Sequence, residues 1–162
     1  MKQLNTEMNL KYRIGNSIDH HLLIKENSIL VLGGKKFNSN YKVVAHSDGD
    51  VFYHAIANAI LNALGFDDIG TYFSDSDEQT KDLDSYKILE FALEKMKLSN
   101  YKINNLSIVF ESDYIMLKNI KFAILKNLKK VLNCNDVSIH GTRTEQKLKL
   151  ISACATILLI NQ

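Results

Sequence analysis

Apolar residues recur at the spacing of one helix face in three segments of the chain, and each segment carries a boundary signal or a clear apolar face. The first follows a capping residue, either Ser47 or Asp50, and stops at Gly65. The second begins after Asp84 and Ser85, and the third covers residues 117–131. The inward faces of these predicted helices are Ile56, Ala59, Ile60, Ala63 and Leu64; Ile88, Leu89, Ala92 and Met96; and Leu117, Ile120, Ile124, Leu128 and Val131.

Short β-favouring runs predict strands at residues 12–18, 28–32, 41–45, 106–110 and 137–140. The closing run, residues 151–160, is apolar at nearly every position, which is typical of a strand buried on both faces. Residues 66–83 contain few apolar side chains and predict a long loop. The predicted fold is α/β, of the α+β type, with a mixed sheet of about four main strands and helices on one face.

Helices on one side leave the opposite face of the predicted sheet open to water. Because that face is apolar in a chain of this size, we expect it to pack against another subunit. Residues 1–11 are polar and predict a flexible leader, whereas residues 12–162 are predicted to form a single domain.

Composition and charge narrow the classes of function. The chain has 162 residues, 46% hydrophobic and 23% charged, the profile of one soluble globular domain. A net charge of +2 gives no reason to expect nucleic acid or a membrane surface as partner. The absence of a long apolar run and of a signal segment predicts a cytoplasmic protein. The two cysteines lack C-x-x-C spacing, and we expect both to be buried thiols.

Asp19, His21 and His54 are candidate metal ligands. Alternation along a strand places Asp19 and His21 on one face, with His20 pointing away, at the end of the first strand. His54 on the following helix could reach this pair. One carboxylate and two imidazoles with a fourth position open suit a catalytic Zn²⁺ ion. The alternative from spacing alone is a set of capping and surface residues.

Three further polar clusters could bind a substrate. His46-Ser47-Asp48-Gly49-Asp50 surrounds a glycine turn at a helix N-terminus, where backbone N–H groups favour anions. Asp68-Ile69-Gly70 and Phe73-Ser74-Asp75-Ser76-Asp77 lie in the long loop, and Thr142-Arg143-Thr144-Glu145 follows a strand. Each cluster also has an ordinary alternative, as a capping turn, a solvated acidic loop or a polar strand end. The Rossmann and P-loop phosphate motifs are absent from the sequence.

The order of these motifs is more informative than any one of them. Arg13-Ile14-Gly15, Asp19-His20-His21, Leu32-Gly33-Gly34, Ala45-His46-Ser47-Asp48-Gly49-Asp50-Val51 with His54-Ala55, Asp68-Ile69-Gly70, Phe73 to Asp77, Asp84-Ser85 and Thr144-Glu145 follow one another along the chain. This set resembles the 2-C-methyl-D-erythritol 2,4-cyclodiphosphate synthase family, which acts in the non-mevalonate route to isoprenoid precursors. The resemblance extends from about Tyr12 to Ile160.

The resemblance implies an architecture and a reaction. It implies a homotrimer with helices outside, sheets facing a central axis and active sites at the subunit interfaces. The implied substrate is 4-diphosphocytidyl-2-C-methyl-D-erythritol 2-phosphate, whose 2-phosphate attacks the β-phosphorus. CMP leaves and 2-C-methyl-D-erythritol 2,4-cyclodiphosphate forms, which makes the enzyme a metal-dependent phosphorus–oxygen lyase.

The resemblance also implies roles for individual residues. One Zn²⁺ ion per subunit would bind to Asp19, His21 and His54, and a Mg²⁺ or Mn²⁺ ion bound with the substrate would meet Glu145. His46 and Arg143 are the catalytic candidates. The implied substrate-binding residues are Asp19, His20, His21, His46, Ser47, Asp68, Ile69, Gly70, Phe73, Ser74, Asp75, Ser76, Asp77, Met116, Leu117, Thr142, Arg143, Thr144 and Glu145.

Two segments depart from the family pattern. Residues 111–117, which the resemblance implies form the cytidine pocket, lack the usual Pro-Lys pair before Met or Leu, and residues 146–152 replace a longer glycine-rich stretch. Arg143 occupies a position that is usually Thr, and we hypothesise that it replaces a phosphate-binding arginine from the shortened stretch. These departures leave open a non-catalytic protein of the same fold that binds a nucleotide or isoprenoid diphosphate. A zinc phosphohydrolase is a third alternative.

Overall fold

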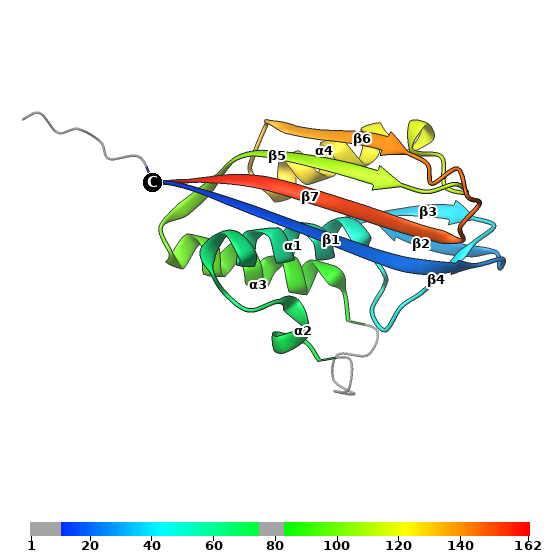
Figure 1. Ribbon diagram of the computed structural model, residues 1–162, viewed down its shortest axis with the longest axis horizontal. Helices are drawn as coiled ribbons and strands as arrows, with labels where there is room; N and C mark the ends of the chain where they lie inside the picture. The colour runs from blue at the N-terminus through cyan, green and yellow to red at the C-terminus, as the bar shows by residue number, and fades with distance from the viewer. Residues whose placement is uncertain (1–10, 75–82) are drawn as a thin grey trace, which may run out of the picture.

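A five-stranded mixed sheet with strand order β4-β1-β7-β5-β6 organises the chain (Figure 1). Strands β5 and β6 are parallel, and the other neighbouring pairs are antiparallel. The computed structural model describes residues 11–74 and 83–162. In chain order the elements are β1 (Tyr12–Ile24), β2 (Ser28–Leu32), β3 (Lys35–Ser39), β4 (Lys42–Val44), α1 (Val51–Leu64), α2 (Ile69–Tyr72), α3 (Ser85–Leu98), β5 (Tyr101–Glu111), η2 (Leu117–Asn119), α4 (Lys121–Val131), β6 (Val137–Thr142) and β7 (Leu150–Asn161).

The predicted α+β class is confirmed, with one more strand in the main sheet than the pattern suggested. Of the predicted leader, only Lys11 lies within the described residues, and its backbone N–H donates to the Asn161 side chain. Asp75, Ser76 and Asp77 lie outside the described residues. Among the helices that the structure describes, none combines the length and apolar character needed to cross a membrane.

Within a single chain, strand β7 is buried mainly on the face toward the helices, and burial of its other face stays a prediction that depends on a partner subunit. The fully buried side chains alternate along the strand and face the helices: Ile151, Ala153, Ala155, Ile157 and Leu159. On the other face Thr156 is exposed, Cys154 and Leu158 are half-buried, and Ser152 is buried. The helices cover only one side of the sheet, so Cys154 is not the buried thiol we expected, whereas Cys134 is.

Strand β1 is longer than predicted and carries Asp19 and His21 in its interior, not at its end. Its pairing with β7 is continuous from Tyr12 opposite Ile160 to Leu22 opposite Leu150. The ladder uses backbone groups alone, so the polar side chains at positions 19 to 21 do not interrupt it. The continuous ladder therefore fixes the backbone positions of Asp19 and His21.

Helix α1 begins and ends at the predicted residues. The Asp50 side chain accepts the backbone N–H groups of Phe52 at 3.0 Å and Tyr53 at 3.3 Å, which caps the first turn. Gly65 ends the helix in the left-handed conformation, with φ of 78°. The helix lies against β1, whose Gly15 lets the backbones approach closely, and this contact places His54 opposite Asp19.

Strands β2 and β3 form a separate hairpin, in which β2 is the predicted strand at residues 28–32 and β3 was not predicted. Gly33 and Gly34, at φ of 57° and 70°, provide the two positive φ angles of a tight turn between them. Their N–H groups donate to the two carboxylate oxygens of Asp50, at 2.8 and 2.7 Å. Asp50 thus caps α1 and also connects this hairpin to the start of α1 through hydrogen bonds.

Two helix boundaries also differ from the pattern. The predicted loop at residues 66–83 contains the short helix α2, which Asp68 caps. The predicted third helix begins at Lys121, because residues 117–119 form a separate 3₁₀ turn, η2. A 3₁₀ turn keeps residues three apart on one side, so Leu117 still faces inward and the apolar pattern cannot distinguish the two. Helix α3 begins after Asp84 as predicted.

Candidate metal centre and substrate cavities

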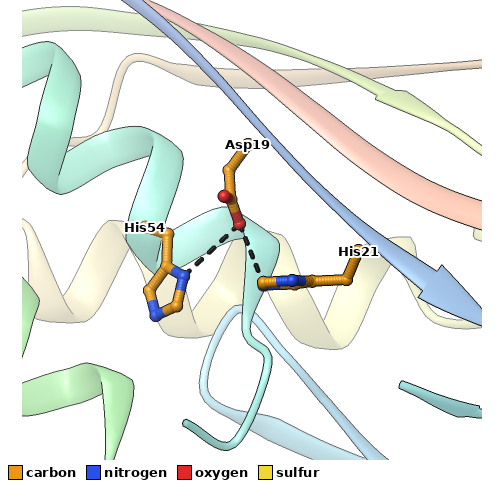
Figure 2. A group of neighbouring side chains, drawn as sticks. All are labelled: Asp19, His21 and His54. Atoms are coloured by element: carbon orange, nitrogen blue, oxygen red, sulfur yellow. Dashed lines mark ion pairs between the residues drawn. The ribbon is translucent and has the colours of Figure 1, made fainter. Parts of the chain in front are cut away.

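Three side chains from β1 and α1 point at one another (Figure 2). Asp19 Oδ2 lies 3.2 Å from His21 Nε2 and 3.4 Å from His54 Nδ1. One ligand atom from each of the three residues lies within 4.8 Å of the other two. The structure thus brings together the three residues that the sequence singled out as metal ligands.

The donor atoms at this centre fit a divalent cation. Asp19 Oδ2 and His21 Nε2 are buried and have no hydrogen-bond partner, although they are close to each other. Buried polar atoms without partners are costly, and a bound cation would supply the missing partner. One carboxylate and two imidazole nitrogens suit Zn²⁺, and three protein ligands leave a fourth position for a substrate oxygen.

The proximity of the carboxylate and the imidazoles shifts the pKa values of Asp19 and His54 in opposite directions. Burial opposes ionisation of Asp19, but the adjacent His21 and His54 outweigh burial and hold the pKa of Asp19 below its ordinary range. Burial also lowers the pKa of His54, and the neighbouring Asp19 outweighs that effect and raises it. The Asp19 carboxylate therefore stays charged, as a metal ligand must be.

A cavity of about 500 Å³ opens at this centre, and we call it the metal cavity. Its lining includes five more of the predicted substrate-binding residues, among them His46, whose Nε2 is buried without a hydrogen-bond partner. Asn58 also contributes, and its side chain accepts the Ile69 N–H at 2.8 Å, joining α1 to α2. The lining residues are Asp19, His21, Val44, Ala45, His46, Ser47, His54, Asn58, Ile69, Gly70, Phe73, Leu83 and Ile88.

Some predicted substrate-binding residues do not reach the metal cavity. His20 is exposed on the opposite face of the sheet, because successive side chains of β1 alternate, so it does not line the metal cavity of this chain. Asp68 caps α2 through the Thr71 N–H at 3.0 Å and does not line the cavity. Ser74 is described but is not among the lining residues.

A second cavity of about 380 Å³ lies beside β5, β6 and η2, and we call it the nucleotide cavity because it contains the segment predicted to bind cytidine. Four of the predicted substrate-binding residues line it: Met116, Leu117, Thr142 and Arg143. Lys118 and Lys121 also line it, although no motif in the sequence singles them out. The lining residues are Phe110, Ser112, Ile115, Met116, Leu117, Lys118, Lys121, Gly141, Thr142 and Arg143.

Thr144 and Glu145 stand beside the nucleotide cavity, not in its lining. The Asp113 carboxylate accepts the Thr144 hydroxyl, the Glu145 N–H at 3.2 Å and the Leu148 N–H at 3.1 Å. These bonds hold the pKa of Asp113 below its ordinary value. Glu145 has a φ of 60° and an exposed side chain, so its carboxylate is open to solvent.

The fold and the centre together define a class: an α+β protein with an Asp-His-His metal centre at the wall of a cavity. Comparison with known proteins specifies it further. The sequence model of the YgbB family matches residues 12–160, and the chain belongs to this family.

Relatives and solved structures agree with this assignment. A 2-C-methyl-D-erythritol 2,4-cyclodiphosphate synthase of Leptospira interrogans is 41% identical over 138 residues, covering 83% of this chain and 86% of its own. One of Mycoplasmoides gallisepticum is 35% identical, covering 94% and 98%. A Plasmodium falciparum IspF structure described as a CDP complex has 36% identity and a TM-score of 0.81, covering 93% and 97%. The predicted family and its cyclodiphosphate synthase function are thereby confirmed.

Proposed function

We propose that this chain converts 4-diphosphocytidyl-2-C-methyl-D-erythritol 2-phosphate to 2-C-methyl-D-erythritol 2,4-cyclodiphosphate and CMP, by metal-assisted intramolecular phosphoryl transfer in the cytoplasm. The observation that carries the proposal is that Asp19, His21 and His54 share one cavity with His46 and Ser47. Metal ligands and anion-binding groups therefore face the same space.

Zn²⁺ is the proposed occupant of the centre, one ion per subunit, held by Asp19 Oδ2, His21 Nε2 and His54 Nδ1. When bound, it supplies Lewis-acid polarisation of a phosphate oxygen. Glu145 is the proposed ligand for a Mg²⁺ or Mn²⁺ ion that arrives with the substrate. The exposed carboxylate of Glu145 and the hydrogen bond that fixes its backbone to Asp113 support this role.

The reaction forms one phosphorus–oxygen bond and breaks another. An oxygen of the 2-phosphate attacks the β-phosphorus, and the bond from that phosphorus to the oxygen bridging the α-phosphate breaks. CMP leaves with the electron pair of the broken bond, and no water is consumed. Such transfers depend on positioning and charge stabilisation more than on a protein nucleophile. The unpartnered Nε2 of His46 and the Ser47 hydroxyl can donate hydrogen bonds to phosphate oxygens in the metal cavity.

The nucleotide cavity is the proposed site for the cytidine end of the substrate. Solved relatives described as CDP complexes support a cytidine nucleotide as ligand. Arg143, Lys118 and Lys121 place three cations in the cavity wall, where a diphosphate would need them. A guanidinium can bind a phosphate through two parallel hydrogen bonds, which suits Arg143 to the role of the missing arginine.

We propose a homotrimer whose active sites lie at subunit interfaces. The metal cavity adjoins β1 and β4, the nucleotide cavity adjoins β5 and β6, and the two share no lining residue. A cyclic oligomer joins two different surfaces of neighbouring chains, which could bring the two cavities together. The uncovered sheet face also exposes apolar side chains, including Ile14 at 72% and Leu22 at 65%.

The test is CMP release from the diphosphocytidyl substrate in the presence of Zn²⁺ and Mg²⁺. Wild-type protein is expected to release CMP, and His54→Ala is expected to lose this activity because it lacks one of three metal ligands. His20→Ala, on the far face of the same strand, is the matched control for a lost imidazole near the centre. A zinc-loaded oligomer that binds CDP but releases no CMP would favour the non-catalytic binding protein.

A further inference from the structure

A buried hydroxyl stands behind the metal centre, on the side of His54 that faces away from Asp19. Ser85 is the first residue of α3, is fully buried, and has its Oγ 2.8 Å from His54 Nε2. The same hydroxyl donates to Asp48 Oδ1, and the Ser85 backbone N–H donates to Asp48 Oδ2 at 3.3 Å. Asp48, Ser85 and His54 thus form a chain of hydrogen bonds that ends at the metal centre.

The directions of these hydrogen bonds follow from the chemistry of the groups. An ionised carboxylate only accepts, so the Ser85 hydroxyl proton points at Asp48. The lone pairs of Ser85 Oγ then remain for His54, and His54 Nε2 must carry the proton between them. His54 Nδ1, which lies 3.4 Å from Asp19 Oδ2, is then the ring nitrogen that can give up its proton and bind a cation.

The arrangement does not suit Ser85 to attack a substrate. Neither Ser85 nor Asp48 lines the metal cavity, and Ser85 has no exposed surface in the described structure. Ser47 does line it and lies 3.3 Å from His54 Nε2, a longer contact than that of Ser85. Ser85 therefore acts on His54 from within the protein.

We call the hydrogen-bonded chain of Asp48, Ser85 and His54 the relay. Two further hydrogen bonds hold Asp48 in place. Its Oδ1 accepts the Asp50 N–H at 3.2 Å at the start of α1, and its own N–H donates to the Leu83 carbonyl at 3.4 Å, just before α3. The relay consequently spans the N-termini of the two helices. A second group that orients a ligating histidine is what a well-ordered metal site requires.

We infer that Asp48 and Ser85 are positioning residues that hold the Nε2–H group of His54 and so orient its Nδ1 toward a divalent cation. This inference rests on the metal centre of the proposed function. It assigns to Ser85, which the sequence marks only as part of a helix start, a role in metal affinity. Ser85→Ala should leave the three ligands in place while His54 loses its closest acceptor.

The experiment measures zinc affinity and the hydrogen bond at His54 Nε2 separately. Zinc dissociation constants come from competition with a chromophoric chelator, and ¹H–¹⁵N NMR of the zinc-loaded protein follows the Nε2–H proton of His54, which a hydrogen bond to Ser85 protects from exchange with water. Ser85→Ala is expected to weaken zinc binding by about 10- to 100-fold and to speed the exchange of that proton. Ser85→Thr, which keeps the hydroxyl, should preserve both properties. Ser152→Ala removes another buried hydroxyl, on a sheet residue opposite His20, and should match wild type.

The outcomes separate this inference from the proposed function. Wild-type protein that binds no zinc contradicts the metal centre of the proposed function itself. Zinc binding by wild type with unchanged affinity in Ser85→Ala, or an unchanged exchange rate of the His54 Nε2–H proton in that variant, overturns the relay. If Ser85→Ala does not fold by circular dichroism, Asp48→Asn is measured in its place against the same two criteria.

Discussion

Gly15 and Ala59 lie so close that a Cβ atom at position 15 would be 1.9 Å from the Ala59 carbonyl oxygen. That oxygen belongs to the backbone of α1, so it cannot rotate away as a side chain would. The contact sets the distance between α1 and β1, the two elements that carry the three metal ligands.

Gly15→Ala is therefore expected to push α1 away from β1. Overpacking of this kind costs about 1–3 kcal/mol of unfolding free energy, measured by urea denaturation. Zinc affinity should fall as well, because His54 moves with the helix. Gly70→Ala is the control, since its Cβ would meet only the Asp68 side chain at 3.3 Å. Wild-type stability in Gly15→Ala would show that the helix spacing is not fixed by this contact.

Asp50 is expected to be the polar side chain whose loss destabilises the fold most. It accepts N–H groups from Gly33, Gly34, Phe52 and Tyr53, so its removal uncaps α1 and releases the β2–β3 hairpin. Asp50→Ala should lower the unfolding free energy by at least about 3 kcal/mol. Asp84→Ala, which removes the cap of α3 alone, should cost about 1 kcal/mol. Equal losses in the two variants would contradict a double role for Asp50.

Asp50 is also expected to affect the pH dependence of the unfolding free energy. Burial raises its pKa from 3.8 to about 6, although the N–H groups of Gly34 and Gly33 act in the opposite direction. The folded state then holds the proton more tightly than the unfolded state does, so its contribution to stability is full below pH 3.8 and is lost as pH rises through about 6. The stability difference between wild type and Asp50→Asn should shrink over that interval in denaturation curves. A constant difference would show that Asp50 does not titrate there.

Metal removal should lower thermal stability. A ligand that binds only the folded state at about 100 times its Kd stabilises that state by about 2.7 kcal/mol. Chelation is expected to lower the Tm of wild type, and added Zn²⁺ to restore it. His21→Ala should have a Tm that responds little to either treatment, because one of the three ligands is missing. A wild-type Tm indifferent to chelator and Zn²⁺ would contradict the centre.

Arg143 is predicted to bind a phosphate of the substrate in the nucleotide cavity. Losing a charge-assisted hydrogen bond of this type costs about 1.5–3 kcal/mol, so Arg143→Ala should lower kcat/KM by about 10- to 100-fold. Arg143→Lys keeps the charge but cannot form two parallel hydrogen bonds, so its kcat/KM should lie between those of wild type and Arg143→Ala. Unchanged kcat/KM in Arg143→Ala would exclude the hypothesis that it replaces the arginine of the shortened segment.

Local sequence signals determined much of the architecture. The caps of α1, the start of α3 and the inward faces of the helices depend on residues a few positions apart, so their spacing is readable along the chain. Period-two alternation likewise placed Asp19 and His21 together and His20 on the other face. The ordered motifs identified the family.

Only the tertiary structure settled how these pieces meet. Spacing left Asp19, His21 and His54 open as capping and surface residues, and their convergence depends on the contact of Gly15 with α1. Strand β1 continues through its polar centre because β7, from the other end of the chain, supplies the backbone partners. Ser85 lies 31 residues from His54, and no periodicity along the chain predicts that hydrogen bond. Caps and periodicities are local properties, whereas ladders, close helix contacts and buried hydrogen bonds form only when distant segments fold together.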